Sequence, residues 1–261
     1  MPGAALVGYT GFVGSTLLRQ TSFSEQYRST DIAGIRGRDL DLLVCAGAPA
    51  KKWIANRDPA MDAAQIDDLV SHLAQVRCRR LVLISTVDVF LNPDGVDERS
   101  PVHTDNLHPY GANRYRLERF VGENFPGSLI VRLPGLVGPG LRKNVIYDFS
   151  HNNNLQAIDS RGVFQFYPMV NLWSDIRVAL ANNLSLVHLT SEPMSVADLV
   201  SDCYGREFHN ELASPPARYD FRSCHAGLFG SASPYQYSRR EVVLAVRSYA
   251  QGASEAEARH A

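Results

Sequence analysis

The chain lacks several features by which protein classes are recognised in a sequence. Its 26 basic and 27 acidic residues give a formal net charge of −1, which attracts neither nucleic acid nor an anionic membrane. No apolar run approaches the roughly 20 residues that span a bilayer. No basic stretch with an apolar run behind it precedes Ala4, so we expect no signal peptide and a soluble, cytoplasmic protein.

Cysteine is scarce, with 4 residues in a chain of 261. Cys45, Cys78, Cys203 and Cys224 form no C-x-x-C pair, and they do not fall at metal-ligand spacing with histidine. We therefore expect reduced thiols in a reducing compartment and no metal centre.

Apolar segments of two kinds alternate over the first half of the chain. The predicted strands are 4–8, 26–29, 31–35, 40–46, 80–85 and 128–132, and the predicted helices are 15–20, 59–76 and 110–125. This alternation is typical of an α/β protein with a parallel, doubly wound sheet. The short span between Gly8 and Asp41 holds one good helix, which predicts a shortened sheet edge. The polar tail 254–261 is expected to fray.

A glycine-rich loop directly follows the first predicted strand. Gly8, Gly11 and Gly14 form the pattern G-x-x-G-x-x-G between that strand and a helix. Glycines let the chain turn tightly and approach a pyrophosphate, and the helix start offers unpaired N–H groups and the positive end of its dipole. The strand–loop–helix context predicts a dinucleotide-binding loop, and a glycine-rich turn of another α/β fold is the alternative.

Six segments, in this order along the chain, resemble the extended branch of the short-chain dehydrogenase/reductase family. They are 8–14, 43–48, 83–90, 109–114, 131–140 and 192–199. Residues 85–90 are most similar to dTDP-4-dehydrorhamnose reductases and related sugar-nucleotide reductases. The resemblance implies a Rossmann sheet with an NAD(P)-binding core at 1–135 and a smaller substrate-binding lobe at 136–261, packed as one structural unit.

The resemblance also implies a catalytic set. In this family a tyrosine is the acid/base, a serine or threonine hydroxyl holds the substrate oxygen, and a lysine one helical turn after the tyrosine lowers its pKa and binds the nicotinamide ribose. Tyr110 and Thr86 match the first two, and Ser85 is expected to point to the other face of its strand. Arg114 replaces the lysine: it keeps the charge but is longer and planar. This replacement leaves two possibilities, a working site with altered geometry and an inactive site, and we expect the working site.

Further cofactor contacts are implied at the loop and at the ends of neighbouring strands. The implied cofactor-binding residues are Gly8, Thr10, Gly11, Phe12, Val13, Gly14, Arg28, Asp31, Ile32, Ala46, Gly47, Ala48, Tyr110, Arg114 and Pro134. Residues 27–30 offer no carboxylate for a ribose 2′-OH, whereas Arg28 can bind a 2′-phosphate through two N–H groups. The sequence therefore favours NADP over NAD, and solvated surface arginines are the alternative.

Substrate contacts are expected from Asp88, Arg142 and Asn144. Family dehydratases carry Asp-Glu directly after the threonine, where this chain has Val87 and Asp88; one carboxylate serves only half of an elimination, so dehydration is disfavoured. A turn cap is the alternative for Asp88. The aromatic run 164–169 is interpreted as core strand rather than as a base-stacking surface. Lys51–Trp53 could approach phosphates or substrate, and a solvated loop is the alternative.

The sequence thus predicts an NAD(P)H-dependent reductase of a ketone on a sugar nucleotide or a similar polyhydroxylated carbonyl compound. The alternatives are a sugar-nucleotide epimerase or dehydratase that retains its cofactor, and a non-catalytic nucleotide-binding sensor or scaffold. Arg114 favours the sensor, and intact Tyr110 and Thr86 argue against it. We expect a small-molecule substrate, no nucleic-acid or membrane partner and, from the resemblance, a homodimer formed through the Tyr110 helix.

Overall fold

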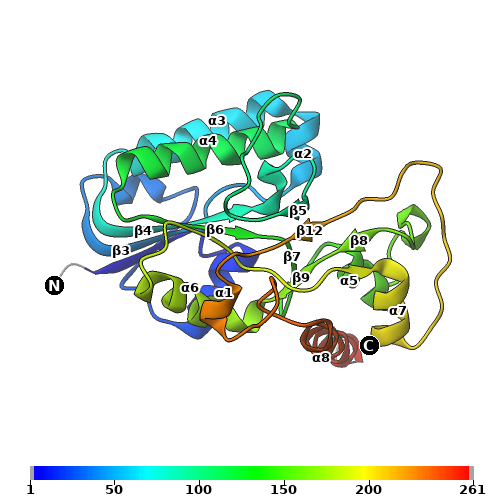
Figure 1. Ribbon diagram of the computed structural model, residues 1–261. Helices are drawn as coiled ribbons and strands as arrows, with labels where there is room; N and C mark the ends of the chain where they lie inside the picture. The colour runs from blue at the N-terminus through cyan, green and yellow to red at the C-terminus, as the bar shows by residue number, and fades with distance from the viewer. Residues whose placement is uncertain (1–2, 259–261) are drawn as a thin grey trace. The chain divides into compact units, whose positions relative to one another are not determined.

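A computed structural model of the chain describes residues 3–258 (Figure 1). The chain divides into two compact units. The first comprises Met1–Leu91, Ser100–Leu133 and Leu172–His188, and the second comprises Asn92–Arg99, Pro134–Asn171 and Leu189–Ala261. Each unit is thus assembled from segments that are separated in the sequence.

The first unit is built on a parallel sheet of six strands. They are β1 (Ala4–Val7), β2 (Glu25–Tyr27), β3 (Asp39–Cys45), β4 (Arg77–Thr86), β6 (Leu129–Leu133) and β10 (Leu186–His188). Their order in the sheet is β10-β6-β4-β3-β1-β2, and each neighbouring pair is parallel. The order reverses between β1 and β3, which is where open α/β sheets bind ligands. The predicted doubly wound Rossmann sheet is confirmed.

Helices cover both faces of this sheet (Figure 1). On one face lie α1 (Phe12–Gln20) and α6 (Leu172–Ala181), and on the other lie α2 (Lys52–Arg57), α3 (Pro59–Leu73) and α4 (Pro109–Asn124). Ile66, Leu69 and Leu73 recur at spacings of three and four, so α3 turns one apolar stripe onto the sheet and buries it in the main core. Burial of each such side chain contributes about 1.5–3 kcal/mol.

The sheet ends at β2, and the strand predicted at 31–35 is wrong. That segment forms a 3₁₀ helix, η1 (Ile32–Ile35), with Ile32 and Ile35 buried. Residues three apart lie on the same side of a 3₁₀ turn, so two isoleucines at this spacing cover the core edge without a strand. The predicted shortening of this edge is confirmed.

The second unit consists of short strands and helices. Its strands are β5 (Asp94–Val96), β7 (Gly135–Val137), β8 (Val163–Phe164), β9 (Phe166–Pro168), β11 (Met194–Ser195) and β12 (Asp220–Phe221), paired as β5–β12, β7–β9 and β8–β11. Its helices are α5 (Val145–Ser150), α7 (Val196–Tyr204) and α8 (Arg239–Ala258). Phe166, Tyr167 and Met169 are buried, which confirms that this aromatic run is core.

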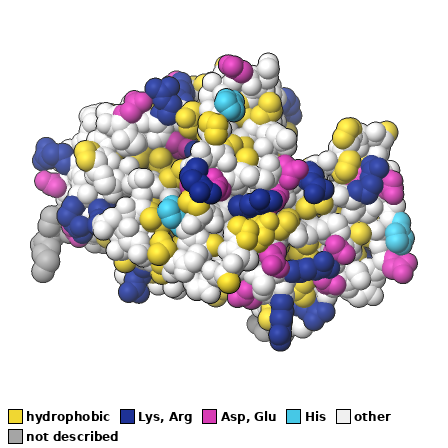
Figure 2. Space-filling model, viewed as in Figure 1, with side chains coloured by type: hydrophobic (Ala, Val, Ile, Leu, Met, Phe, Trp, Pro, Cys, Tyr) yellow, Lys and Arg dark blue, Asp and Glu magenta, His cyan; other side chains and the backbone are white. Residues whose placement is uncertain are grey.

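The backbone of α8 is helical to Ala258, and the fraying predicted from residue 254 stays a prediction; residues 259–261 lie outside the described part of the chain. None of the helices within residues 3–258 is both long and apolar enough to cross a membrane. On the face shown in Figure 2, basic and acidic side chains are interspersed, which agrees with the balanced charge of the sequence.

Candidate active site

The glycine loop joins β1 to α1 at the point where the strand order reverses. Gly8 has φ +85°, and a Cβ there would lie 2.3 Å from the carbonyl oxygen of Ala46 at the end of β3. A Cβ on Gly14 would lie 2.2 Å from the Gly8 carbonyl oxygen. Gly11, the N-cap of α1, has no side chain to cap the first helical N–H groups. The predicted strand–loop–helix unit is confirmed, and its helix start is open to an anion.

We expect Gly14→Ala to weaken dinucleotide binding by at least about 10-fold, because the added methyl group displaces the loop that carries the N–H groups. The dissociation constant can be measured by calorimetry. Gly122→Ala is the matched control, because a Cβ at Gly122 meets no atom within 4 Å and alanine favours a helix interior such as α4. Unchanged binding by Gly14→Ala would exclude this loop as the nucleotide site.

Thr86 and Tyr110 meet where β4 ends and α4 begins. The Thr86 side chain lies close enough to the Tyr110 hydroxyl to lower its pKa. The Asp88 N–H donates to Thr86 Oγ1 at 3.1 Å, and the Tyr110 N–H donates to Asn56 Oδ1 at 3.1 Å. Each of the two residues is therefore fixed by a hydrogen bond between a backbone N–H and a side-chain oxygen. Tyr110 is only 8% exposed.

Arg114 lies one helical turn after Tyr110 and is buried, at 3% exposure. Its guanidinium carbon lies 4.1 Å from the centroid of the Tyr110 ring. One terminal nitrogen is ion-paired with Asp62 on α3, and the other donates to the Pro49 carbonyl oxygen. Arg114 Nε is buried and has no hydrogen-bond partner among the described residues. The arginine therefore stacks on the tyrosine while a carboxylate compensates its charge.

The environment of Tyr110 favours its neutral form. Burial is the largest influence and raises the pKa of Tyr110; the charges of Asp88 and Asp62 act in the same direction. Arg114 and the Thr86 hydrogen bond lower this pKa without cancelling the effect of burial. Tyr110 is thus protonated throughout the neutral range.

The raised pKa of Tyr110 predicts how the reaction rate depends on pH. The ketone reduction expected from the sequence would use protonated Tyr110, so kcat/KM should stay level through neutral pH and fall only as the pH passes the raised pKa, above the ordinary value of about 10. Steady-state rates and a tyrosinate absorbance titration should give the same midpoint. A rate that falls with a midpoint below about pH 8 would assign proton transfer to another group.

A second charged pair lies beside the tyrosine. Lys52 Nζ is 2.7 Å from Asp88 Oδ1, and their side chains are 39% and 18% exposed. The ring of His108, which caps α4 through Nδ1, lies 6.3 Å from the Tyr110 ring. Burial and the Lys52 charge lower the pKa of His108. Of the segment Lys51–Trp53, for which a solvated loop was the alternative, Lys51 is an exposed loop residue, whereas Lys52 and Trp53 begin α2. Only the tertiary fold brings Lys52 to Asp88.

Ser85 has a different partner from Thr86. Its hydroxyl donates to Glu118, which is ion-paired with Arg132 at 2.7 Å. All three side chains are buried, and they tie β4 to α4 and to β6. Because Ser85 belongs to this network, Thr86 is the hydroxyl that accompanies Tyr110, as the alternation along the strand predicts.

The predicted adenosine-side residues lie along β2, η1 and the end of β3. Arg28 and Asp31 are exposed and form an ion pair at 3.6 Å, and the Arg28 N–H donates to Asp31 Oδ1 at 2.7 Å. Ile32 is buried in the core. Ala46–Ala48 follow β3 directly and are half-buried. These positions line the same sheet edge as the glycine loop.

Three residues predicted to bind cofactor or substrate, Pro134, Arg142 and Asn144, belong to the second unit. Pro134 begins a segment of that unit, and Arg142 is exposed. Asn144 has φ 102° and caps α5, since its Oδ1 accepts from the N–H groups of residues 146 and 147 while its Nδ2 donates to the Leu136 carbonyl oxygen at 2.9 Å. The amide of Asn144 therefore serves the local fold.

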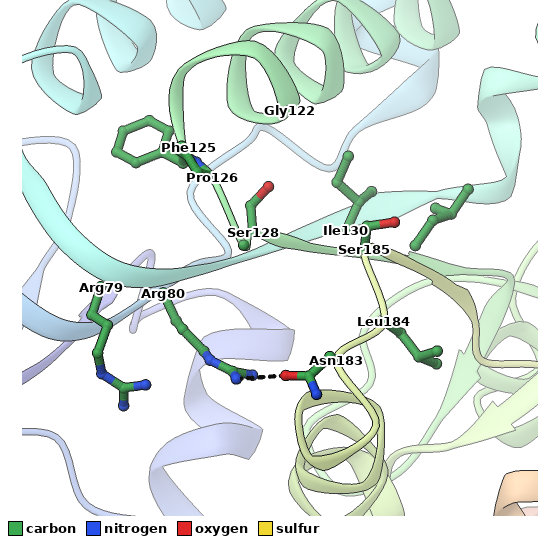
Figure 3. Close-up of a pocket in the computed structure, with 12 residues that line it drawn as sticks. Arg79, Arg80, Gly122, Phe125, Pro126, Ser128, Ile130, Asn183, Leu184 and Ser185 are labelled. Atoms are coloured by element: carbon green, nitrogen blue, oxygen red, sulfur yellow. Dashed lines mark hydrogen bonds between the residues drawn. The ribbon is translucent and has the colours of Figure 1, made fainter.

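A cavity of about 400 Å³ opens at the opposite edge of the sheet (Figure 3). It lies where β4, β6 and β10 begin, and its lining includes Arg80, Ser128 and Ser185. Arg80 donates to the Leu180 carbonyl oxygen and to Asn183 Oδ1, both at 2.8 Å. Ligands of open α/β sheets bind at the carboxyl ends of the strands, so this cavity is separate from the candidate site.

No protein-family model matches the sequence. A search of the curated proteins likewise finds no match. Sequence similarity alone therefore does not place the chain in a family.

Solved structures, in contrast, match over almost the whole chain. UDP-glucuronic acid 4-epimerase from Bacillus cereus, in complex with NAD, superposes with a TM-score of 0.71 at 15% identity, covering 97% of this chain and 99% of that one. An NAD-dependent NDP-hexosamine 5,6-dehydratase of tunicamycin biosynthesis superposes with a TM-score of 0.73 at 18% identity, covering 95% of this chain and 96% of that one. dTDP-4-dehydrorhamnose reductase from Bacillus anthracis, in complex with NADP, superposes with a TM-score of 0.72 at 17% identity, covering 95% of this chain and 98% of that one. At these identities the shared property is the fold.

Proposed function

We propose that this protein is an NAD(P)-dependent oxidoreductase that reduces a ketone on a sugar nucleotide or a similar polyhydroxylated carbonyl compound. The observation that carries the proposal is the pair of Thr86 and buried Tyr110, in which the Thr86 side chain acts on the Tyr110 hydroxyl. The pair lies at the carboxyl end of β4, on the sheet edge that also carries the glycine loop. The three superposed enzymes, a reductase, an epimerase and a dehydratase of sugar nucleotides, support the substrate class.

The residues at this edge fit a dinucleotide. The tight approach of Gly14 to Gly8 forms a cradle that a Cβ would fill, and buried Arg114 Nε is a donor without a described partner. The loop N–H groups would hold the pyrophosphate, residues 46–48 would line the adenosine side, and Arg28 would meet a 2′-phosphate. When bound, the nicotinamide supplies the hydride.

Tyr110 and Thr86 carry out the proton transfer to the substrate. Tyr110 donates its phenolic proton to the carbonyl oxygen of the substrate, and the Thr86 hydroxyl beside it helps to hold that oxygen. The tyrosinate that remains is stabilised by the Arg114 guanidinium over its ring. Asp62 keeps that guanidinium in place. General-acid catalysis of this kind contributes about 10²–10⁴-fold in rate.

The pair of Lys52 and Asp88 favours a second candidate function, dehydration or epimerisation next to a ketone. An elimination needs a base at one carbon and an acid at the leaving hydroxyl. The sequence offered one carboxylate for these two tasks, and Lys52 at 2.7 Å supplies a second group. The reactions differ in stoichiometry: reduction consumes one reduced nucleotide per turnover, whereas dehydration and epimerisation return the cofactor unchanged.

The testing experiment is thermal unfolding with NAD⁺, NADH, NADP⁺ and NADPH in turn, followed by a screen of sugar-nucleotide ketones. A nucleotide at 100 times its Kd stabilises the native state by about 2.7 kcal/mol, which raises the midpoint by roughly 5–10 °C at this chain length. Oxidation of the reduced nucleotide then follows ketone reduction. If none of the four raises the midpoint, and none has co-purified, the proposal is wrong.

Arg28→Ala should weaken NADP⁺ and NADPH binding about 10-fold and leave NAD⁺ and NADH unchanged, because one charge-assisted hydrogen bond to phosphate contributes about 1.5–3 kcal/mol. Calorimetric titration of all four nucleotides measures this. Arg77→Ala is the control, since Arg77 is exposed and paired with Asp39 where β4 begins. If the binding of NADP(H) and of NAD(H) were weakened equally, Arg28 would not be the residue that binds the 2′-phosphate.

A further inference from the structure

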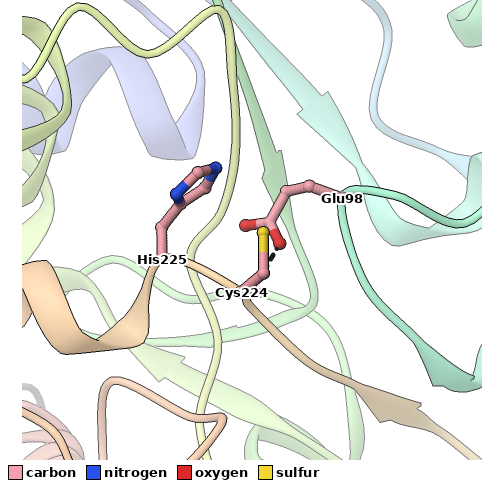
Figure 4. A group of neighbouring side chains, drawn as sticks. All are labelled: Glu98, Cys224 and His225. Carbon is pink, nitrogen blue, oxygen red and sulfur yellow. Dashed lines mark hydrogen bonds between the residues drawn. The ribbon is translucent and has the colours of Figure 1, made fainter.

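Two strands of the second unit bring metal-ligating side chains together. β5 and β12 are parallel neighbours, with Asp94 opposite Asp220 and Val96 opposite Phe221. The N–H of residue 222 donates to the Val96 carbonyl oxygen at 2.7 Å, which extends the pairing. Parallel strands end at the same edge of a sheet, so the residues that follow them, Glu98 and Cys224, lie side by side (Figure 4).

His225 completes a group of three donors. The Cys224 sulfur, a ring nitrogen of His225 and a carboxylate oxygen of Glu98 all lie within 4.8 Å of one another. Among the described residues, this is the one group of His, Cys, Asp and Glu ligand atoms that converges so closely. Bonds of about 2.3 Å to sulfur and 2.0–2.2 Å to nitrogen and oxygen place tetrahedral ligands roughly 3.5 Å apart, so small side-chain rotations close the group on a metal.

The carboxylate of Glu98 is already oriented. Ser223 Oγ donates to Glu98 Oε1 at 2.6 Å, and the Cys224 N–H donates to Oε2 at 2.7 Å. Hydrogen bonds of this kind fix the direction of metal ligands in known sites. Arg99, the neighbouring cation, is paired with Asp97 at 2.5 Å. The His225 ring makes no hydrogen bond or ion pair with another described residue.

We propose that Glu98, Cys224 and His225 form a zinc site with three protein ligands and an open fourth position. One sulfur, one nitrogen and one oxygen donor suit Zn²⁺, which takes all three types, whereas Ca²⁺ and Mg²⁺ require oxygen ligands. Three protein ligands leave the fourth place to water. The site belongs to the second unit and does not depend on the proposed reductase activity.

Cobalt titration of the chelator-treated protein tests the proposal. Co²⁺ should give a saturable thiolate-to-metal absorption band at one equivalent, and Zn²⁺ should remove the band by competition. Cys224→Ser should abolish the band, and His225→Ala and Glu98→Gln should each weaken metal binding by at least about 10-fold. The controls are Cys203→Ser and His209→Ala, which should bind as the parent protein does; His209 is paired with Glu207 on the surface.

Absence of a saturable band would overturn the proposal, and so would a band that survives Cys224→Ser or disappears in Cys203→Ser. Unfolding midpoints of the metal-free variants show whether each one folds. Cys224 is the exposed cysteine, so alkylation of the folded parent protein gives a second test that needs no variant. Zn²⁺ should slow that alkylation, and equal rates with and without Zn²⁺ would contradict the site.

Discussion

Tyr110→Phe is expected to lower kcat for ketone reduction by about 10²–10⁴-fold and to leave nucleotide binding nearly unchanged. The substitution removes the proposed proton donor and keeps the ring, whose centroid lies 4.1 Å from the Arg114 guanidinium carbon. Because the proposed proton donation takes place in the transition state, the loss should appear in kcat and in kcat/KM alike. Stopped-flow and steady-state assays with the ketone found in the screen measure both constants.

Tyr115→Phe is the matched control, since Tyr115 lies on the same helix and is not part of the pair of Thr86 and Tyr110. It should retain the parent rate. Loss of nucleotide binding in Tyr110→Phe would point to a structural role for the hydroxyl. Full turnover by Tyr110→Phe would remove Tyr110 from the mechanism and leave Asp88 and Lys52 as the remaining acid/base candidates.

Asp62→Asn is expected to destabilise the protein by about 3–5 kcal/mol, because it leaves the buried Arg114 guanidinium without its counter-charge. Both side chains are only 3% exposed, so water cannot compensate. The change keeps the shape of the side chain and its place in the first turn of α3, and it removes the charge. The midpoint of thermal unfolding should fall by roughly 6–20 °C.

The control is Glu123→Gln, which breaks the exposed ion pair of Arg119 and Glu123 on α4 and should cost less than about 1 kcal/mol. Arg114→Lys, which keeps a cation for Asp62, should fold and retain or raise turnover. If Arg114→Lys folded but lost turnover, Arg114 would have a role beyond its positive charge. Equal effects of Asp62→Asn and Glu123→Gln would show that the buried pair is dispensable.

The six-stranded sheet could largely be predicted from the sequence. Continuous apolar runs such as 40–46 and 80–85 are typical of parallel strands buried on both faces, and the three-four spacing of Ile66, Leu69 and Leu73 indicates one helix face. The segment 31–35 was predicted wrongly because two isoleucines three residues apart suit a 3₁₀ turn as well as a short strand. A run of five residues carries too little periodicity to separate the two.

The sequence by itself determined the glycine loop, the position of Tyr110 and the choice of Thr86 over Ser85, because each depends on local spacing or on strand alternation. Only the tertiary structure decided which charges meet. Asp62 is 52 residues from Arg114, Lys52 is 36 from Asp88, and Glu98 is 126 from Cys224. Such pairs depend on the order of strands in a sheet and on the packing of helices on it. Neither can be predicted from a local sequence pattern.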